Sequence, residues 1–220
     1  MLHENRRTRR YADAVNAALD PVAARKSERT RQRLLDIAIL RFAAKGFRKT
    51  SVSEIAREAG RTPATVYNYY ARKEGLFAAA VDADAAALID KALTAVSGTV
   101  STRERVLRFV GALVNHVDEH PLARRVLAGH EPEVVGRLLE IPSLLEVTAT
   151  VAELLAEGQR TGEIRRGVDP AVLALGLETI VLSLLMGTLQ TGGGDAPRQT
   201  AVLAVLDAAL RPADEFVSGA

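Results

Sequence analysis

The stretch of residues 50–77, TSVSEIAREAGRTPATVYNYYARKEGLF, decides the fold of this chain. Its pattern predicts two short helices, over residues 52–59 and 63–70, with a turn at Gly60 between them. Two short helices joined by a glycine-containing turn are typical of a helix-turn-helix. A long helix over residues 73–96 is expected to follow almost directly.

Local capping signals mark where both short helices begin. Ser51 caps the first, and Glu54 three residues later completes a capping box. Thr62 caps the second, and Pro63 occupies its first position, where a missing N–H does no harm.

The second short helix has the residue types of a helix that reads DNA. Val66 is expected to pack inward, while small Pro63 and Ala64 allow close approach to the major groove. Asn68 can pair with adenine in bidentate fashion, although a lone helical Asn is often merely solvated. The residues predicted to contact DNA, through bases or phosphates, are Thr50, Ser51, Arg61, Thr62, Pro63, Ala64, Thr65, Tyr67, Asn68, Tyr69 and Lys73.

The rest of the chain also predicts helices, so the expected fold class is all-α. Helix-forming residues dominate and long alternating β-branched runs are absent. The further helices are expected at about residues 27–44, 102–119, 122–128, 132–139, 143–161, 169–191 and 196–210, with Gly46 ending the first and Ser143 capping the one that it begins.

Charge divides the 220-residue chain unevenly. Residues 1–75 hold 17 Lys and Arg against 8 Asp and Glu, a balance of +9, whereas residues 76–220 hold 12 against 19, a balance of −7. We therefore expect a basic extension over residues 1–27, a DNA-binding domain over residues 28–75, and a second domain over residues 76–220. Arg6, Arg7, Arg9 and Arg10 of the extension form either a minor-groove arm or a solvated tail.

Several classes of function find no support. The chain has no cysteine, which excludes thiolate zinc sites and thiol nucleophiles. His116 and His120 share a helix face, but no zinc motif accompanies them, and solvated or capping histidines explain them better. We expect no enzyme, metal or cofactor. No signal peptide is evident, and a buried helix explains the apolar region at residues 171–189 better than a membrane span. The expected location is the cytoplasm.

The stretch quoted above resembles the DNA-binding segment of the TetR (tetracycline-repressor-like) regulators. The strong resemblance covers about residues 31–80. Arg61 departs from the small apolar residue that is usual there, Asn68 stands where members vary, and the aromatic at the position of Tyr70 is often Phe. The matching residues are Ile37, Ala38, Phe42, Gly46, Phe47, Thr50, Ile55, Ala56, Gly60, Thr65, Val66, Tyr67, Tyr69, Tyr70, Lys73, Glu74 and Leu76.

The resemblance implies a larger C-terminal helical domain that binds a small effector and forms a homodimer. Apolar stripes on residues 169–191 and 196–210 either meet a second copy of the chain or fill the chain's own core. The effector would be hydrophobic or amphipathic. The residues expected to line its pocket are Phe77, Val81, Phe109, Leu113, His116, Val117, Leu127 and Leu144.

The resulting hypothesis is a homodimeric, ligand-responsive transcriptional regulator that an effector releases from a palindromic DNA operator. A non-specific architectural DNA-binding protein is the first alternative, in which the basic arm dominates binding. An enzyme with a vestigial DNA-binding domain is the second, but no catalytic constellation supports it.

Overall fold

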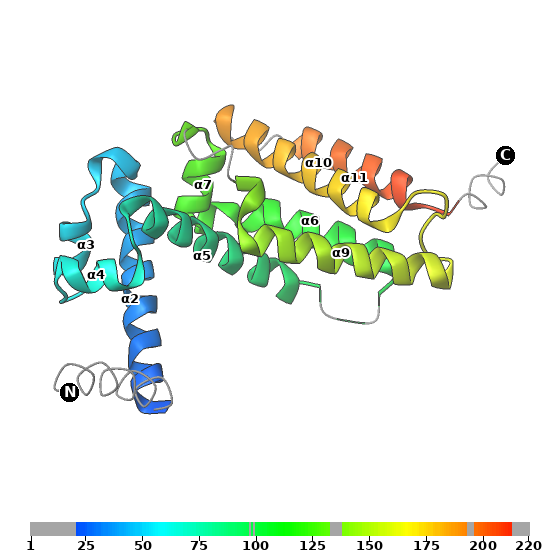
Figure 1. Cartoon of the computed structure of the whole chain (residues 1–220). Coiled ribbons are helices and arrows are strands. Elements are labelled where there is room, and N and C mark those ends of the chain that lie inside the picture. The colour runs from blue at the N-terminus through cyan, green and yellow to red at the C-terminus, as the bar shows by residue number, and fades with distance from the viewer. Residues whose placement is uncertain (1–20, 97, 99, 133–137, 193–195, 213–220) are drawn as a thin grey trace.

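The computed structural model describes residues 21–96, 98, 100–132, 138–192 and 196–212. The described residues form helices, turns and loops without any strand, which confirms the all-α prediction. Helices α2, α3 and α4 form a small unit at one end of the molecule, and α5 leads from it into a larger helical body (Figure 1).

The small unit is built from the first three helices around one apolar cluster. Phe42, Ile55 and Val66 come from different helices and are almost fully buried together. Burial of apolar side chains from all three helices holds the unit together. The helices are α2 (Pro21–Lys49), α3 (Val52–Glu58) and α4 (Pro63–Tyr69).

The larger body contains the remaining helices. In Figure 1, α10 and α11 lie side by side along one edge, and α6 and α9 lie below them. The elements are α5 (Lys73–Thr94), α6 (Thr102–His116), η1 (Val117–Glu119), α7 (Pro121–Leu127), η2 (Leu138–Glu140), α9 (Pro142–Thr161), α10 (Pro170–Gln190) and α11 (Ala196–Leu210).

Two helix starts differ from the prediction. α2 begins at Pro21 rather than at Ser27 or Glu28, because proline is compatible with a first helical position and need not end a segment. The helix therefore runs through the boundary drawn at residue 27. Ser143 is not the cap of α9: Pro142 already occupies the first turn, and the Ser143 N–H donates to Asp82 Oδ1 of α5 at 2.9 Å. The helix expected over residues 132–139 falls largely outside the described residues.

The apolar stripe on α10 divides between the interior and the surface. Leu182 and Leu185 face the interior of the body, whereas Val172 and Leu175 are 60% and 57% exposed. By length and composition α10 could cross a membrane, but only 28% of its most apolar window is buried in this chain. The expectation of a buried helix was thus only half right, because one face of α10 is uncovered.

Candidate functional site

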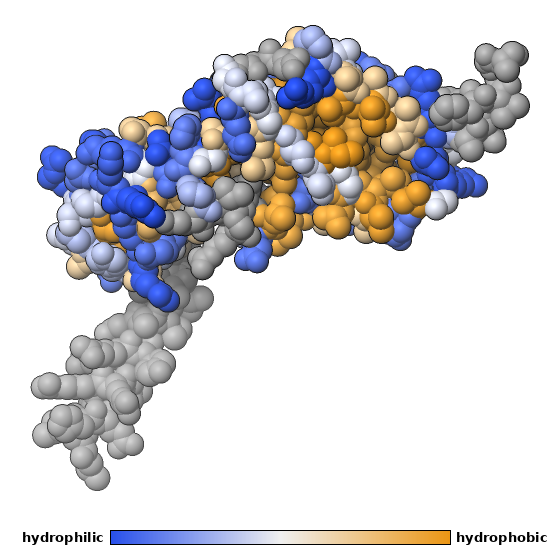
Figure 2. Space-filling view, turned by 90° about the horizontal axis from the view of Figure 1, so that it is seen from above, coloured by the Kyte–Doolittle hydropathy of each residue, from blue (hydrophilic) through white to orange (hydrophobic). Residues whose placement is uncertain are grey.

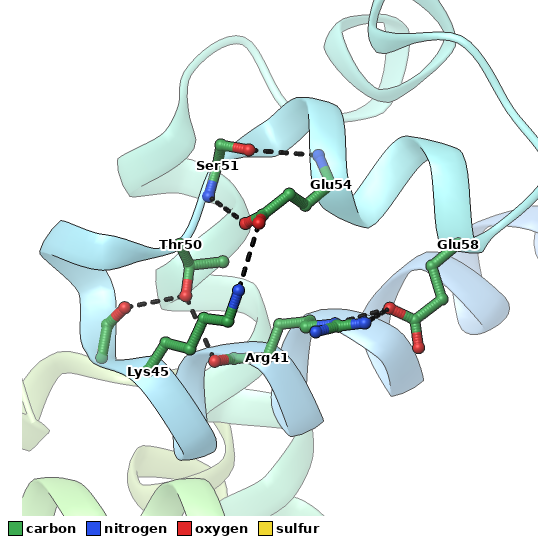
Figure 3. A network of polar contacts seen from close by, with 7 residues as sticks. Arg41, Lys45, Thr50, Ser51, Glu54 and Glu58 are labelled. Atoms are coloured by element: carbon green, nitrogen blue, oxygen red, sulfur yellow. Dashed lines mark hydrogen bonds and ion pairs between the residues drawn. The ribbon is translucent and has the colours of Figure 1, made fainter.

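A polar network holds the start of α3 against α2 (Figure 3). Glu54 N–H donates to Ser51 Oγ at 3.1 Å and Ser51 N–H donates to Glu54 Oε2 at 3.3 Å, which is the predicted capping box. Lys45 Nζ donates to Glu54 Oε1 at 3.1 Å. The bond from Lys45, followed by the bond from the Ser51 backbone, lowers the pKa of Glu54. The network therefore supports α3 in a defined position on α2.

Thr50 is turned inward, unlike the other predicted contact residues. Only 2% of the residue is exposed, and its hydroxyl lies 2.8 Å from Gly46 O and 3.1 Å from Arg41 O (Figure 3). The hydroxyl has one hydrogen to donate and already has these carbonyl acceptors. The side chain of Thr50 thus joins α2 to α3 and is not on the surface, which leaves Ser51 as the exposed residue of the pair.

The turn between α3 and α4 depends on the backbone conformation of a glycine. Gly60 has a φ of 66°, in the left-handed region where a side chain would be strained. The Arg61 N–H donates to Ala56 O at 2.8 Å and the Gly60 N–H to Arg57 O at 3.1 Å. This pair of bonds is a Schellman motif, which ends α3 and aims α4 away from it.

α4 is a two-turn helix with one buried face. Thr62 caps it by accepting from the Thr65 N–H at 3.3 Å, and Val66 is buried beneath it. Thr65 and Tyr69 are half-buried at its flank. The predicted contact residues that the structure leaves exposed on and before this helix are Arg61, Thr62, Pro63, Ala64, Tyr67 and Asn68.

The first turns of α2 lie against α4. Tyr69 Oη is 3.1 Å from Ser27 Oγ, and Arg61 donates through Nη2 to Thr30 Oγ1 at 3.4 Å. These contacts place the beginning of α2 beside the short helix. The Arg6–Arg10 arm lies outside the described residues.

The sequence analysis missed a row of cations on this part of α2. Between Pro21 and Leu34 the only acidic residue is Glu28, and the basic residues are all exposed. They are Arg25, Lys26, Arg29, Arg31 and Arg33. Their clustering on one helix is a signal of polyanion binding, but the boundary drawn at residue 27 divided the cluster between two segments.

Lys73 lies at the junction of the two parts of the molecule. Its Nζ is 4.5 Å from the centroid of the Phe47 ring and donates to Arg48 O at 3.5 Å. The ammonium group therefore has a cation–π partner and a carbonyl acceptor in the last turn of α2. Lys73 thereby stabilises the end of α2, which leads directly into Thr50 and Ser51.

Tyr70 packs into the core of the small unit. Its hydroxyl is buried without a hydrogen-bond partner among the described residues. Burial raises the pKa of Tyr70, and the nearby Arg31 opposes this rise. The buried hydroxyl thus lowers the stability of an otherwise apolar cluster.

A compact joint connects the small unit to α7. Gly46, with a φ of 79°, lies directly under the ion pair in which Arg125 Nε donates to Glu131 Oε1 at 2.7 Å. The Phe47 N–H donates to the same carboxylate oxygen at 3.2 Å. Beside it, the Phe77 ring of α5 packs edge-on to Phe42 at 4.9 Å between centroids. Two helices of the body, α5 and α7, therefore hold the end of α2.

The body encloses an apolar cavity of about 110 Å³ between α5, α6, α7, α9 and α10. Of the eight residues expected to line a pocket, five line this one cavity: Val81, Phe109, Leu113, Leu127 and Leu144. Helical periodicity could not reveal the residues that complete the wall from α9 and α10, because they resemble ordinary core residues.

The other three expected pocket residues lie elsewhere. Phe77 belongs to the aromatic joint, because the first turn of α5 faces α2. His116 Nδ1 is 2.7 Å from Glu119 Oε1 at the end of α6, and Val117 is buried in the following η1 turn. α6 ends at His116, so His116 and Val117 do not continue the cavity-facing stripe.

His120 is buried in a hydrogen-bonded cluster beside the cavity wall. Its Nδ1 is 3.3 Å from Asp84 Oδ1, and Asp84 Oδ2 accepts from the Leu122 and Ala123 N–H groups at 2.8 and 2.9 Å. Asp84 of α5 thereby caps α7 from outside. No group of three or more metal-ligating side chains occurs among the residues that the structure describes.

Comparison with known proteins identifies the small unit. Residues 34–80 match the family model described as bacterial regulatory proteins, tetR family. This segment of the chain is thus a match to the DNA-binding part of that family. The match spans α2 from Leu34, both short helices and the start of α5, and it confirms the resemblance seen over about residues 31–80.

Relatives match more of this chain, at low identity. The nucleoid occlusion factor SlmA of Pasteurella multocida is 26% identical over 132 residues, which are 58% of this chain and 66% of that protein. The match thus spans slightly less than two thirds of the relative's length.

Solved structures share the fold. A TetR-family transcriptional regulator from Rhodococcus sp. has a TM-score of 0.64 at 22% identity, covering 82% of this chain and 98% of that one. The regulator FadR of Bacillus subtilis, in complex with stearoyl-CoA, has a TM-score of 0.58 at 19% identity, covering 82% of this chain and 99% of that one. The fold of these two structures therefore extends over most of this chain.

Proposed function

We propose that this protein is a ligand-responsive, DNA-binding transcriptional regulator, most simply a repressor. The observation that carries the proposal is α4: a two-turn helix with one buried face, whose other face presents small and polar side chains. Such a helix suits the major groove, with Pro63 and Ala64 at close approach and Asn68 toward a base edge. The exposed cations at the start of α2 would contact phosphates beside it.

The apolar cavity supports the ligand-responsive part of the proposal. Most of the cavity wall consists of apolar side chains, so a small hydrophobic or amphipathic effector would pack against it without breaking hydrogen bonds there. FadR of similar fold is described in complex with stearoyl-CoA, which is an amphipathic molecule.

The same helices line the cavity and hold the DNA-binding unit. α5 contributes Val81 to the cavity and Phe77 to the joint, and α7 contributes Leu127 to the cavity and Arg125 to the joint. A shift of either helix on ligand binding would move α2 and with it α4. Coupling between such sites is typically about 1–3 kcal/mol.

An uncovered apolar face supports a homodimer. Val172 and Leu175 of α10 and Val205 of α11 are each more than half exposed, and Figure 2 shows broad apolar areas on this side of the body. Pairing two such faces about a two-fold axis would bury them. The two α4 helices would then enter successive major grooves of a palindromic operator, about 34–36 Å apart.

A cytoplasmic protein without catalytic activity, membrane partner or cofactor fits this role. An alternative is an architectural DNA-binding protein that tolerates many sequences. The specific observation in its favour is the similarity to a nucleoid occlusion factor.

One experiment separates the two functions. Fluorescence anisotropy would measure binding to DNA flanking the gene and to a scrambled duplex of the same composition, at several salt concentrations. A regulator should saturate on one flanking segment and bind the scrambled duplex at least about 1,000-fold more weakly. Equal affinities would favour the architectural protein, and no saturable binding at moderate salt would exclude both.

A further inference from the structure

The wall of the apolar cavity contains two polar side chains that face each other. Of the 21 lining residues, 19 are aliphatic or aromatic, and the exceptions are Thr148 of α9 and Glu178 of α10. Thr148 donates its hydroxyl hydrogen to Glu178 Oε2. Any polar part of a ligand in this cavity must therefore meet this pair.

The pair offers acceptors and no donor. The hydroxyl hydrogen of Thr148 is committed to Glu178, and a carboxylate has only acceptor atoms. Among the residues that the structure describes, the lining contains no Lys, Arg, His, Asn, Gln, Tyr or Trp. A carboxylate or phosphate placed here would face another anion without a compensating donor, which is strongly unfavourable away from water.

A neighbouring hollow continues the acidic character outward. It lies between α5 and α9 and shares Ile89 and Val147 with the cavity. Its described lining includes Asp90 and Glu146 but no basic residue.

We propose that the cavity binds an apolar molecule carrying a protonated amine, whose ammonium group donates to Glu178. This inference rests on the proposed function of the cavity as the effector site and names the ligand class. Charge-assisted hydrogen bonds to a carboxylate are stronger than neutral ones, and the hydrocarbon of the ligand would fill the surrounding apolar wall. The class differs from the acyl-CoA bound by FadR, whose phosphates would need donors that this lining lacks.

Three probes of equal chain length isolate the head group: decylammonium, decanol and decanoate. Isothermal titration calorimetry on the full chain without DNA should show decylammonium binding at least about tenfold more tightly than decanol. Decanoate should bind most weakly. Tighter binding of decanoate or of stearoyl-CoA, or no binding by decylammonium, would overturn the assignment.

Two variants locate the effect. Glu178→Gln keeps the shape of the side chain and an acceptor for Thr148. It should lower the ratio of the affinity for decylammonium to the affinity for decanol by about tenfold. Thr148→Val keeps the carboxylate and should retain the preference. Glu153→Gln, on the exposed side of α9, is the matched control and should change nothing. An unchanged preference in Glu178→Gln would refute the role of Glu178.

The ligand class and the regulatory function fail in different ways. If decylammonium binds through Glu178 but leaves DNA affinity unchanged, the ligand class stands and the ligand-responsive regulator is wrong. If the chain binds its operator but decylammonium does not bind the chain, the ligand class is wrong and DNA binding stands.

Discussion

The DNA-binding unit and the helical body use apolar residues in opposite ways. In the unit, Phe42, Ile55 and Val66 close a small core, and the exposed side of α4 is small or polar. In the body, apolar side chains also surround a cavity and cover the outside of α10 and α11. The unit is therefore complete as a packed domain, whereas the body keeps apolar surface that its own packing does not cover.

The difference teaches where function can be read from residue types. On α4 the functional surface differs chemically from the core, so polar and small side chains distinguish it. In the body, the cavity wall and the core are both made of Leu, Val and Ala, and the uncovered face is made of the same residues. The joint at Gly46 connects the two regions, and a substitution there is expected to have the largest effect on how they pack together.

The largest expected effect is that of Gly46→Ala. A side chain here would combine a positive φ with a Cβ only 2.6 Å from Arg125 Nη2 and 2.7 Å from Glu131 Oε1. We expect a loss of about 1–3 kcal/mol from the backbone conformation, with further loss from the displaced ion pair. Urea unfolding measures it. Gly75→Ala in α5 meets no atom within 4 Å and should be neutral or slightly stabilising, and equal losses in both variants would contradict the joint.

Asn68→Ala tests whether the exposed face of α4 reads bases. We expect relaxed preference at one base pair of the operator, at a cost of about 1–3 kcal/mol in binding, because the amide pairs with one base edge. Binding to a panel of single-base operator variants measures it. Asn115→Ala on the exposed side of α6 is the control, since it changes the same side chain in the body. A uniform loss across all operator variants would instead assign Asn68 to phosphate contact.

Tyr70→Phe should strengthen the DNA-binding unit. It removes a buried hydroxyl without a partner in the described part of the chain, and we expect about 1 kcal/mol of added stability. Because burial raises the pKa of Tyr70, the unfolded chain ionises first, and wild-type stability should fall as pH rises above about 10. Thermal unfolding between pH 8 and pH 11 would measure both effects. Tyr67→Phe, on the exposed face of α4, keeps Tyr70 and should match the wild type in stability and in its pH dependence. A lower melting temperature for Tyr70→Phe would reveal a partner for the hydroxyl.

The smallest expected effect is that of Arg29→Ala, on the basic start of α2. If Arg29 contacts one phosphate, the slope of log affinity against log salt should decrease in magnitude by about 0.9, without any change in base preference. Lys73→Ala should reduce the slope similarly, and it should also weaken folding, because Lys73 contacts the Phe47 ring. Arg160→Ala, in the last turn of α9, is the control. A slope unchanged by Arg29→Ala would leave the start of α2 off the DNA.

Most helix bounds near the DNA-binding unit were predictable, because local chemistry sets them. Ser51 with Glu54, Thr62 with Pro63, and Asp169 with Pro170 begin helices as expected. The prediction was wrong where two local signals compete. The helix expected from residue 27 begins at Pro21, and Pro142 lies in the first turn of the helix that Ser143 was expected to cap.

The sequence by itself determined the helix-turn-helix of this protein and the residues that α4 exposes. Capping bonds and periodic apolar burial act within a few residues, so the sequence alone predicts them. Only the tertiary structure decided that Thr50 faces inward, that Gly46 lies beneath Arg125, and that Thr148 and Glu178 meet in one cavity. Those arrangements join residues as much as 79 positions apart, and the packing of whole helices brings them together.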